Sequence, residues 1–331
     1  MKYRVPVLFF FLITFVCGSV CVCEAQTVEE TAVRLRAMTQ SAEVPSGPFA
    51  CGVLCADQNP SRAVLFDANA DWSTPEAVLW EWRADRSEDV KPEHRAWFAA
   101  MDEVKPILDR THVLVTASGG GVALIRAADK KVLFYAFAGG NPHSAVRLPD
   151  GNIVTASSNG MFLTLFDVPK TSEAYDPERV ARKKYAFDDT HGLFWDDPQQ
   201  ILWVLGGSEL AGFRYFSKDG TPALERICAY PLAGTAALGG HDLCPVPGTP
   251  FLFVTGVGAA IFDTRTRELL PFSEITRVKS ISLSPDGVLL IQKPRQSWHN
   301  ESILFFNATQ DVFRTCPGSQ FYKARWWTDG F

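Results

Sequence analysis

Short apolar runs separated by polar turns fill most of the chain, and this pattern predicts β-strands rather than helices. The turns are rich in Asn, Pro, Asp, Gly and Ser, which favour tight reversals of the backbone. The first predicted strands cover residues 51–56, 62–66, 77–82, 104–108, 113–117, 121–126 and 132–138. From residue 104 onward, the apolar runs come in successive groups of four. The spacing of the runs within each group predicts a small antiparallel sheet of four strands.

This four-strand unit repeats, and the first strand of each repeat opens on a lysine or a histidine. The six openers are Lys105, His143, His191, His241, Lys279 and Lys323. The steps between them are 38, 48, 50, 38 and 44 residues. A period of roughly 40–50 residues with four strands per unit is typical of a β-propeller.

The two ends of the repeat region complement one another. The last predicted strand, 322–327, has the pattern of a first strand but is followed by no second, third or fourth, whereas the region at residue 51 starts without a first strand. Pairing them would remove an open sheet edge. We therefore predict an all-β, six-bladed β-propeller over residues 47–331, with ring closure by the C-terminal strand pairing with the N-terminal strands.

The N-terminal residues predict export. Lys2 and Arg4 precede a long apolar run, and small residues near Ala25 could form a cleavage site, so residues 1–25 are expected to be a signal peptide. A membrane anchor is the competing interpretation, but the run is short for a span. Residues 26–46 are expected to form a polar leader. The mature protein would then be secreted or periplasmic, with no membrane association after signal cleavage.

The net charge of −5 and the lack of a basic tract argue against a nucleic-acid partner. Any attraction for anions must therefore be local. We expect the protein to be a monomer that binds a small or oligomeric anionic ligand.

In a propeller the innermost strands line a central channel, so the six openers are predicted to share one mouth of it. Lysine is depleted in strands and is rarely buried without a partner, which favours a binding site over a core position. The competing interpretation is a solvated channel mouth without a ligand. Further residues predicted to bind substrate near this mouth are Gln58, Asn59, Arg147, Lys293, Arg295 and Trp298.

Two chemistries fit such a mouth. In one, His143, His191 and His241 hold a divalent metal, zinc or manganese, since three histidines with an open position form a known catalytic arrangement. The lysines oppose this, because like charges 4 Å apart cost roughly 4 kcal/mol in a surface-like dielectric. In the other, no metal is needed: Lys105, Lys279 and Lys323 bind an anion, and one of the histidines is catalytic as a general acid or base. The sequence favours the second chemistry.

Several segments carry a family resemblance. ILDRTHVLVTASGGGVALI, AGGNPHSAVRLPDGNIVTASSNG, HGLFWD, GGHDLCPVPG and KARWW resemble a family of secreted bacterial six-bladed β-propeller proteins of unknown function, over residues 50–331. The resemblance implies the fold and the export. In the rim of the channel mouth alone, the chain is similar to two groups of propeller enzymes. One group is the propeller lyases called peptidyl-hydroxyglycine lyases, which hold zinc with three channel histidines. The other is the arylsulfate sulfotransferases, which use channel His and Arg residues without a metal. The lysine openers depart from the lyase pattern.

Together these features predict an enzyme, a lyase or hydrolase acting on an anionic carbohydrate at a Lys/His-lined channel mouth. The lysines would neutralise the anion, and one histidine would transfer the proton. The alternative is a non-catalytic propeller module that binds an anionic glycan or a partner protein.

Overall fold

The computed structural model describes residues 49, 51–170, 175–273, 275–295, 297–306 and 311–331. The predicted signal peptide (1–25) and leader (26–46) lie outside the described residues. Within the described part of the chain, no helix is long and apolar enough to span a membrane.

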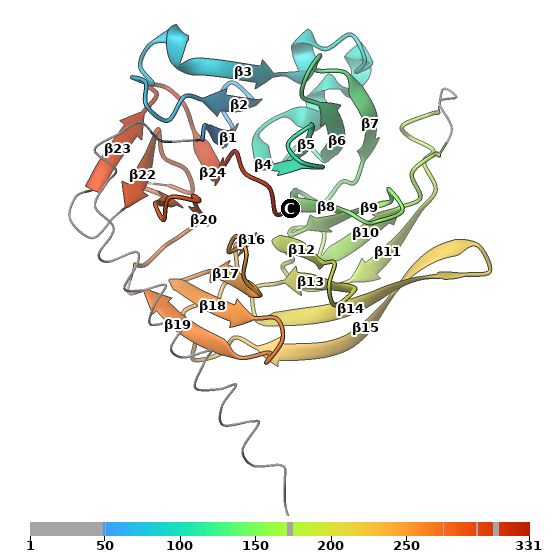
Figure 1. Cartoon of the computed structure of the whole chain (residues 1–331). Helices are drawn as coiled ribbons and strands as arrows, with labels where there is room; N and C mark the ends of the chain where they lie inside the picture. Colours follow the sequence, from blue (N-terminus) through green and yellow to red (C-terminus); the bar gives the residue numbers. More distant parts are fainter. Residues whose placement is uncertain (1–48, 50, 171–174, 274, 296, 307–310) are drawn as a thin grey trace, which may run out of the picture.

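The described strands form six four-stranded antiparallel sheets, which surround a central axis as the blades of a propeller (Figure 1). This confirms the predicted fold. The innermost strands are β24, β4, β8, β12, β16 and β20, each of which contacts the innermost strands of neighbouring blades.

The bounds of the strands are as follows. Blade 1 contains β24 (Phe321–Trp326), β1 (Val53–Asp57), β2 (Arg62–Phe66) and β3 (Val78–Trp82). Blade 2 contains β4 (Met101–Ile107), β5 (His112–Ala117), β6 (Gly121–Arg126) and β7 (Val132–Phe137). Blade 3 contains β8 (Pro142–Arg147), β9 (Ile153–Ser157), β10 (Phe162–Phe166) and β11 (Arg182–Ala186).

The remaining three blades are contiguous in sequence. Blade 4 contains β12 (Gly192–Asp196), β13 (Ile201–Leu205), β14 (Glu209–Lys218) and β15 (Thr221–Pro231). Blade 5 contains β16 (Asp242–Pro245), β17 (Phe251–Thr255), β18 (Ala259–Asp263) and β19 (Leu269–Ser273). Blade 6 contains β20 (Ser280–Leu283), β21 (Leu289–Gln292), β22 (Ser302–Phe306) and β23 (Asp311–Thr315). Between β2 and β4 lie three short 3₁₀ helices, η1 (Pro75–Ala77), η2 (Ala84–Arg86) and η3 (Pro92–Phe98).

The ring closes as the sequence predicts, because β24 pairs antiparallel with β1. Val53 faces Trp326 and Cys55 faces Ala324 in this register. Trp326 is fully buried and also joins the closing strand to blade 6, since its indole N–H donates to the carbonyl oxygen of Val288 at 2.9 Å. Its ring meets that of Phe305 edge-on, with centroids 5.4 Å apart.

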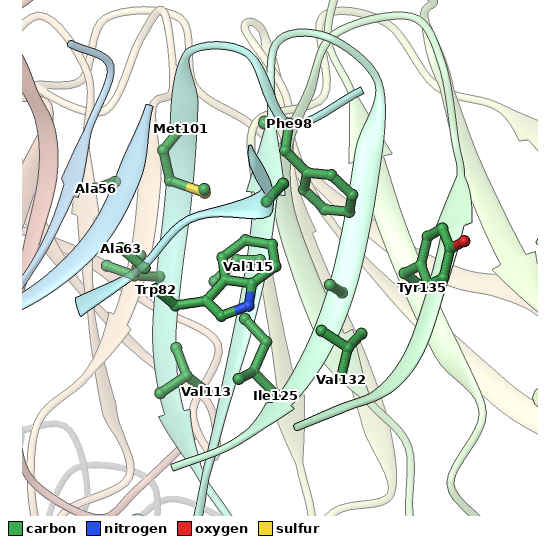
Figure 2. Close-up of a cluster of buried hydrophobic side chains, with 14 of the residues drawn as sticks. Ala56, Ala63, Trp82, Phe98, Met101, Val113, Val115, Ile125, Val132 and Tyr135 are labelled. Atoms are coloured by element: carbon green, nitrogen blue, oxygen red, sulfur yellow. The ribbon is translucent and has the colours of Figure 1, made fainter. Parts of the chain in front are cut away.

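The core is divided among the blade interfaces. Among the described residues, six clusters of buried apolar side chains each lie between two neighbouring blades. Figure 2 shows the cluster between blades 1 and 2, where Trp82 and Phe98 pack above Val113 and Ile125. Because each sheet is covered on both faces, its central strands are apolar almost throughout rather than alternating.

Replacing Trp326 with alanine is expected to destabilise the propeller by about 3–5 kcal/mol, because the change opens a large cavity at the closure of the ring. Urea denaturation followed by circular dichroism would measure this. The control is Leu79→Ala, whose side chain is 59% exposed and whose loss should cost within about 0.5 kcal/mol. Equal losses in both variants would show that ring closure does not depend on this packing.

Candidate functional site

One side chain from each blade meets at one mouth of the central channel. We call this set the mouth ring. It consists of Asp102, His143, His191, His241, Lys279 and Tyr322. The structure therefore brings together the three predicted histidines and one of the three predicted lysines.

The six positions are equivalent in the blades, but they arise in two ways. His191, His241 and Lys279 stand immediately before their innermost strands, and each backbone N–H donates to the last residue of the next strand. The other three residues, Asp102, His143 and Tyr322, are extra residues at β-bulges, because the register shifts by one across each of them. A bulge redirects a side chain out of the sheet ladder, and here it sends each of these side chains to the mouth ring.

The imidazoles form a continuous contact surface. His143 and His191 meet edge-to-face with ring centroids 4.5 Å apart, and His191 and His241 do so at 5.3 Å. Tyr322 packs on the other side of His143 at 5.2 Å. Lys279 completes the circle: its Nζ lies 3.1 Å from Nε2 of His241 and 5.3 Å from the centre of the Tyr322 ring.

Burial keeps the histidines neutral. It lowers the pKa of His241 to about 2, with the Lys279 ammonium as the second cause, and it holds the pKa of His143 well below 6.5. The pKa of His191 is lowered for the same reason. The Nδ1–H of His191 donates to the carbonyl oxygen of Asp189 at 2.8 Å, which leaves Nε2 as the proton acceptor. The ring therefore offers neutral imidazoles at physiological pH.

Lys279 and Tyr322 have shifted pKa values too. Burial, and then the nearby charge of Lys323, lower the pKa of Lys279 to about 8, so its ammonium form still predominates at neutral pH. Burial raises the pKa of Tyr322 well above 10, so this residue stays a phenol and a proton donor.

Asp102 is a buried carboxyl with an unusual acidity. Burial raises its pKa from 3.8 to about 7, although the hydroxyl of Ser118 and the amide of Gln58 both donate to it at 2.7 Å. Its Oδ2 lies 3.8 Å from Nδ1 of His143, a buried nitrogen that has no hydrogen-bond partner among the described residues. This pair can hold or release a proton near neutral pH.

Lys105 and Lys323 do not reach the mouth ring, and the expectation that all six openers share the mouth is wrong for these two. Lys105 is the fifth residue of β4, and Lys323 is the third residue of β24. Both are buried. They belong to a second set of charged side chains deeper in the channel, which we call the axial ion network: Glu103, Lys105, Asp242, Lys323 and Arg325.

The axial ion network pairs its charges closely. Nη2 of Arg325 donates to Asp242 at 2.6 Å and to Glu103 at 2.8 Å. Burial by itself would raise the carboxyl pKa values, but Arg325 and Lys323 hold the pKa of Asp242 at about 2 and that of Glu103 below 4.5. Lys105 donates to three oxygens, those of Ser144, Ala145 and Leu193, at 2.7–3.0 Å.

Gln58 and Trp298 lie beside the mouth, as predicted. The Trp298 indole N–H donates to Oε1 of Gln58 at 2.8 Å, and Gln58 in turn contacts Asp102 of the mouth ring. The Trp298 side chain is 57% exposed. Asn59 follows Gln58, and its amide donates to the carbonyl oxygen of Gly318.

The other predicted binding residues lie in two different places. Arg147 ends β8, whereas His143 is near its beginning, so Arg147 is at the far end of the channel and its predicted place at the mouth is wrong. There it lines a small cavity of about 50 Å³ with Trp195 and Phe331. Phe331 lies over the axis, as the C-terminal label in Figure 1 shows, with its ring 5.0 Å from Arg325 Cζ. Lys293 and Arg295 line a cleft on blade 6.

A metal bound by all three imidazoles would require rearrangement, since Lys279 already donates toward Nε2 of His241. The described residues contain no group of three His, Cys, Asp or Glu side chains arranged to hold a metal ion. The zinc or manganese alternative stays a prediction.

Sequence reasoning missed Asp102, Tyr322 and the acids of the axial ion network. The available signal was the run MDEVKPI, in which two adjacent acids precede Lys105 in an otherwise apolar strand. Their equivalence with the histidines was missed because the pattern took Lys105, three residues after Asp102, and Lys323, one residue after Tyr322, as the openers.

Comparisons with known proteins give a family and a fold. A family of unknown function (DUF6528) matches residues 6–331. None of the curated proteins matches the chain. A protein of unknown function from Bacteroides caccae superposes with a TM-score of 0.54 at 11% identity, covering 85% of this chain and 99% of that one. A functionally unknown protein from Desulfotomaculum acetoxidans gives a TM-score of 0.47 at 13% identity, over 83% and 80% of the two chains. The similarity to the Bacteroides caccae protein shows a shared fold alone. The similarity of the channel rim to that of lyases and sulfotransferases stays a prediction.

The raised pKa of Asp102 predicts a pH-dependent effect of Asp102→Asn. A carboxyl whose pKa is higher in the folded state stabilises the fold below pH 4 and loses that contribution as pH rises to 7. The variant should therefore gain stability relative to wild type across this window, by at most about 4 kcal/mol. Urea denaturation at half-unit steps from pH 4 to 8 would measure the difference, and a constant difference would contradict the assignment.

Glu103→Gln is expected to cost about 3–5 kcal/mol of stability, because it removes one carboxylate from three buried cations, Lys105, Lys323 and Arg325, and leaves Asp242 alone to balance them. The control is Glu225→Gln, which removes an exposed ion pair with Arg214 and should cost within about 1 kcal/mol. Chemical denaturation at pH 7 measures the free energy of unfolding of both variants. A small loss of stability in both would show that the axial ion network contributes little to the stability of the fold.

Proposed function

We propose that this chain, which belongs to the family of unknown function DUF6528, is an enzyme that cleaves an anionic carbohydrate at the mouth ring. The observation that carries the proposal is the contact of the cationic Lys279 with the neutral imidazole of His241, which is continuous with two further imidazoles at one channel mouth. Cleavage by β-elimination is the reaction that this set of groups fits best.

Lys279 supplies the recognition of an anion. It forms no ion pair with the carboxylates in the described part of the chain, and it is partly rather than fully buried. Placed over His241, its ammonium is available to a carboxylate or sulfate from outside the protein. A uronate carboxylate bound there would be neutralised, which makes the adjacent C–H bond more acidic.

Trp298 supports a sugar as the ligand. Its indole is fixed at the edge of the mouth by the hydrogen bond to Gln58, yet more than half of the side chain is exposed. An exposed aromatic face held in place offers a surface on which an apolar sugar face can pack. Gln58 also links this indole to Asp102, so the aromatic face and the acid–base groups share one hydrogen-bonded chain.

The proton transfers can be assigned to particular groups. Nε2 of His191 takes the proton from the carbon next to the uronate carboxylate, because its Nδ1–H is committed to Asp189. The electron pair forms a carbon–carbon double bond as the bond to the glycosidic oxygen breaks. Tyr322, which stays protonated, donates a proton to that oxygen. The products are an unsaturated uronate and a shortened sugar chain.

Hydrolysis is the second reaction to test, and Asp102 is the specific observation in its favour. A carboxyl with a pKa near 7 is suited to protonate a leaving group. A glycosidase needs a second carboxylate, and Asp189, beside His191, is the carboxylate available for that role.

Purified protein is expected to release unsaturated products from acidic oligosaccharides, detected by their ultraviolet absorbance. His191→Ala should reduce the rate roughly 10²–10⁴-fold, as expected for the loss of a general base. Lys279→Met should raise KM and also lower kcat, because it removes the charge that binds the carboxylate and makes the adjacent C–H bond more acidic. His112→Ala, outside the mouth ring on β5, is the matched control and should retain full activity.

The other outcomes are distinct. New reducing ends without the absorbance would favour hydrolysis, and binding without turnover would favour the non-catalytic module. Loss of activity after chelation, restored by zinc or manganese, would overturn the metal-free mechanism. No binding and no turnover on any uronate or sulfated sugar would overturn the proposal.

A further inference from the structure

We propose that the substrate is an anionic oligomer, which extends from the mouth ring into a second, cationic subsite on blade 6. This inference rests on the proposed function and adds the size class of the substrate to it. The subsite is a cleft of about 820 Å³. The residues that carry the argument are Arg277, Lys293, Arg295, Asn300 and Phe313.

The cleft adjoins the mouth ring through the backbone of blade 6. Arg277 stands two residues before Lys279, and the backbone N–H of Lys279 donates to the carbonyl oxygen of Gln292 at 3.0 Å. Lys293 directly follows Gln292. Arg277 is close enough to Lys279 to contribute to the lowering of its pKa. A chain leaving the mouth over blade 6 would therefore pass directly over these cations.

The three cations of the cleft are exposed, and none of them forms an ion pair with a carboxylate in the described part of the chain. Several other surface arginines do: Arg83 pairs with Asp85, and Arg126 pairs with Asp129. Three positive charges along one cleft, without a carboxylate partner among the described residues, favour a ligand with several negative groups.

The cleft also has a polar and an apolar component suited to sugars. Phe313 is 57% exposed and lines the cleft, while Asn300 holds the loop above it by donating to the carbonyl oxygen of Lys293 at 3.0 Å. The backbone N–H of Arg295 donates to His299, next to Trp298. One loop thus carries the indole of the mouth and two cations of the cleft, and an oligosaccharide could contact both.

The test compares oligogalacturonides of two, four and eight units, in the His191→Ala background so that no ligand is consumed. Affinity, measured by titration calorimetry, should rise roughly tenfold from the dimer to the octamer, as expected for a few exposed charge contacts. The double substitution Arg277→Gln and Lys293→Gln should remove this increase and leave dimer binding unchanged. It should also weaken the dependence of octamer affinity on NaCl.

The matched control carries Lys183→Gln and Lys218→Gln, which remove the same charge from exposed positions on blades 3 and 4. It should retain the increase with length. Affinity that does not depend on length in the unsubstituted background, or an equal loss in the control, would overturn this inference alone. Absence of binding at every length would instead overturn the proposed function.

Discussion

The pairing of buried charges on the propeller axis is the interaction on which the rest of the structure depends. Arg325 on β24 connects Glu103 of blade 2 with Asp242 of blade 5, and Lys323 donates to the backbone carbonyls of His143 and His191 on blades 3 and 4. Five of the six blades are thereby joined across the channel. A buried charge costs several kcal/mol unless it is paired, so these side chains constrain the inner strands to one arrangement.

The axial ion network also sets the chemistry of the mouth. Lys323 of this network adds positive potential to the effect of burial, and the two together hold the imidazoles neutral and keep the pKa of Lys279 near 8. At Asp102, burial outweighs the charge of Lys323 and raises the pKa of the carboxyl. The mouth ring therefore combines neutral imidazole bases, a phenol and a carboxyl whose pKa is near 7.

The two ends of the channel differ. At one end the mouth ring is bordered by the exposed Trp298 and by the cationic cleft of blade 6. At the other, Phe331 lies over Lys105 and Arg325 and lines a small cavity. This asymmetry favours approach of a ligand from the side of the histidines.

The sequence by itself determined the number of blades, their strands and the closure by β24, because the repeat period and the two incomplete ends are local patterns. It also identified His143, His191, His241 and Lys279, which occupy one repeat position. Tertiary structure alone decided how deep each opener lies. Asp102 and Tyr322 occupy bulge positions equivalent to that of His143 and lie at the mouth, whereas Lys105, three residues after Asp102, and Lys323, one residue after Tyr322, lie among buried acids. A bulge depends on the pairing of two strands and on the charges that face them across the axis, and neither is written in the spacing of one strand.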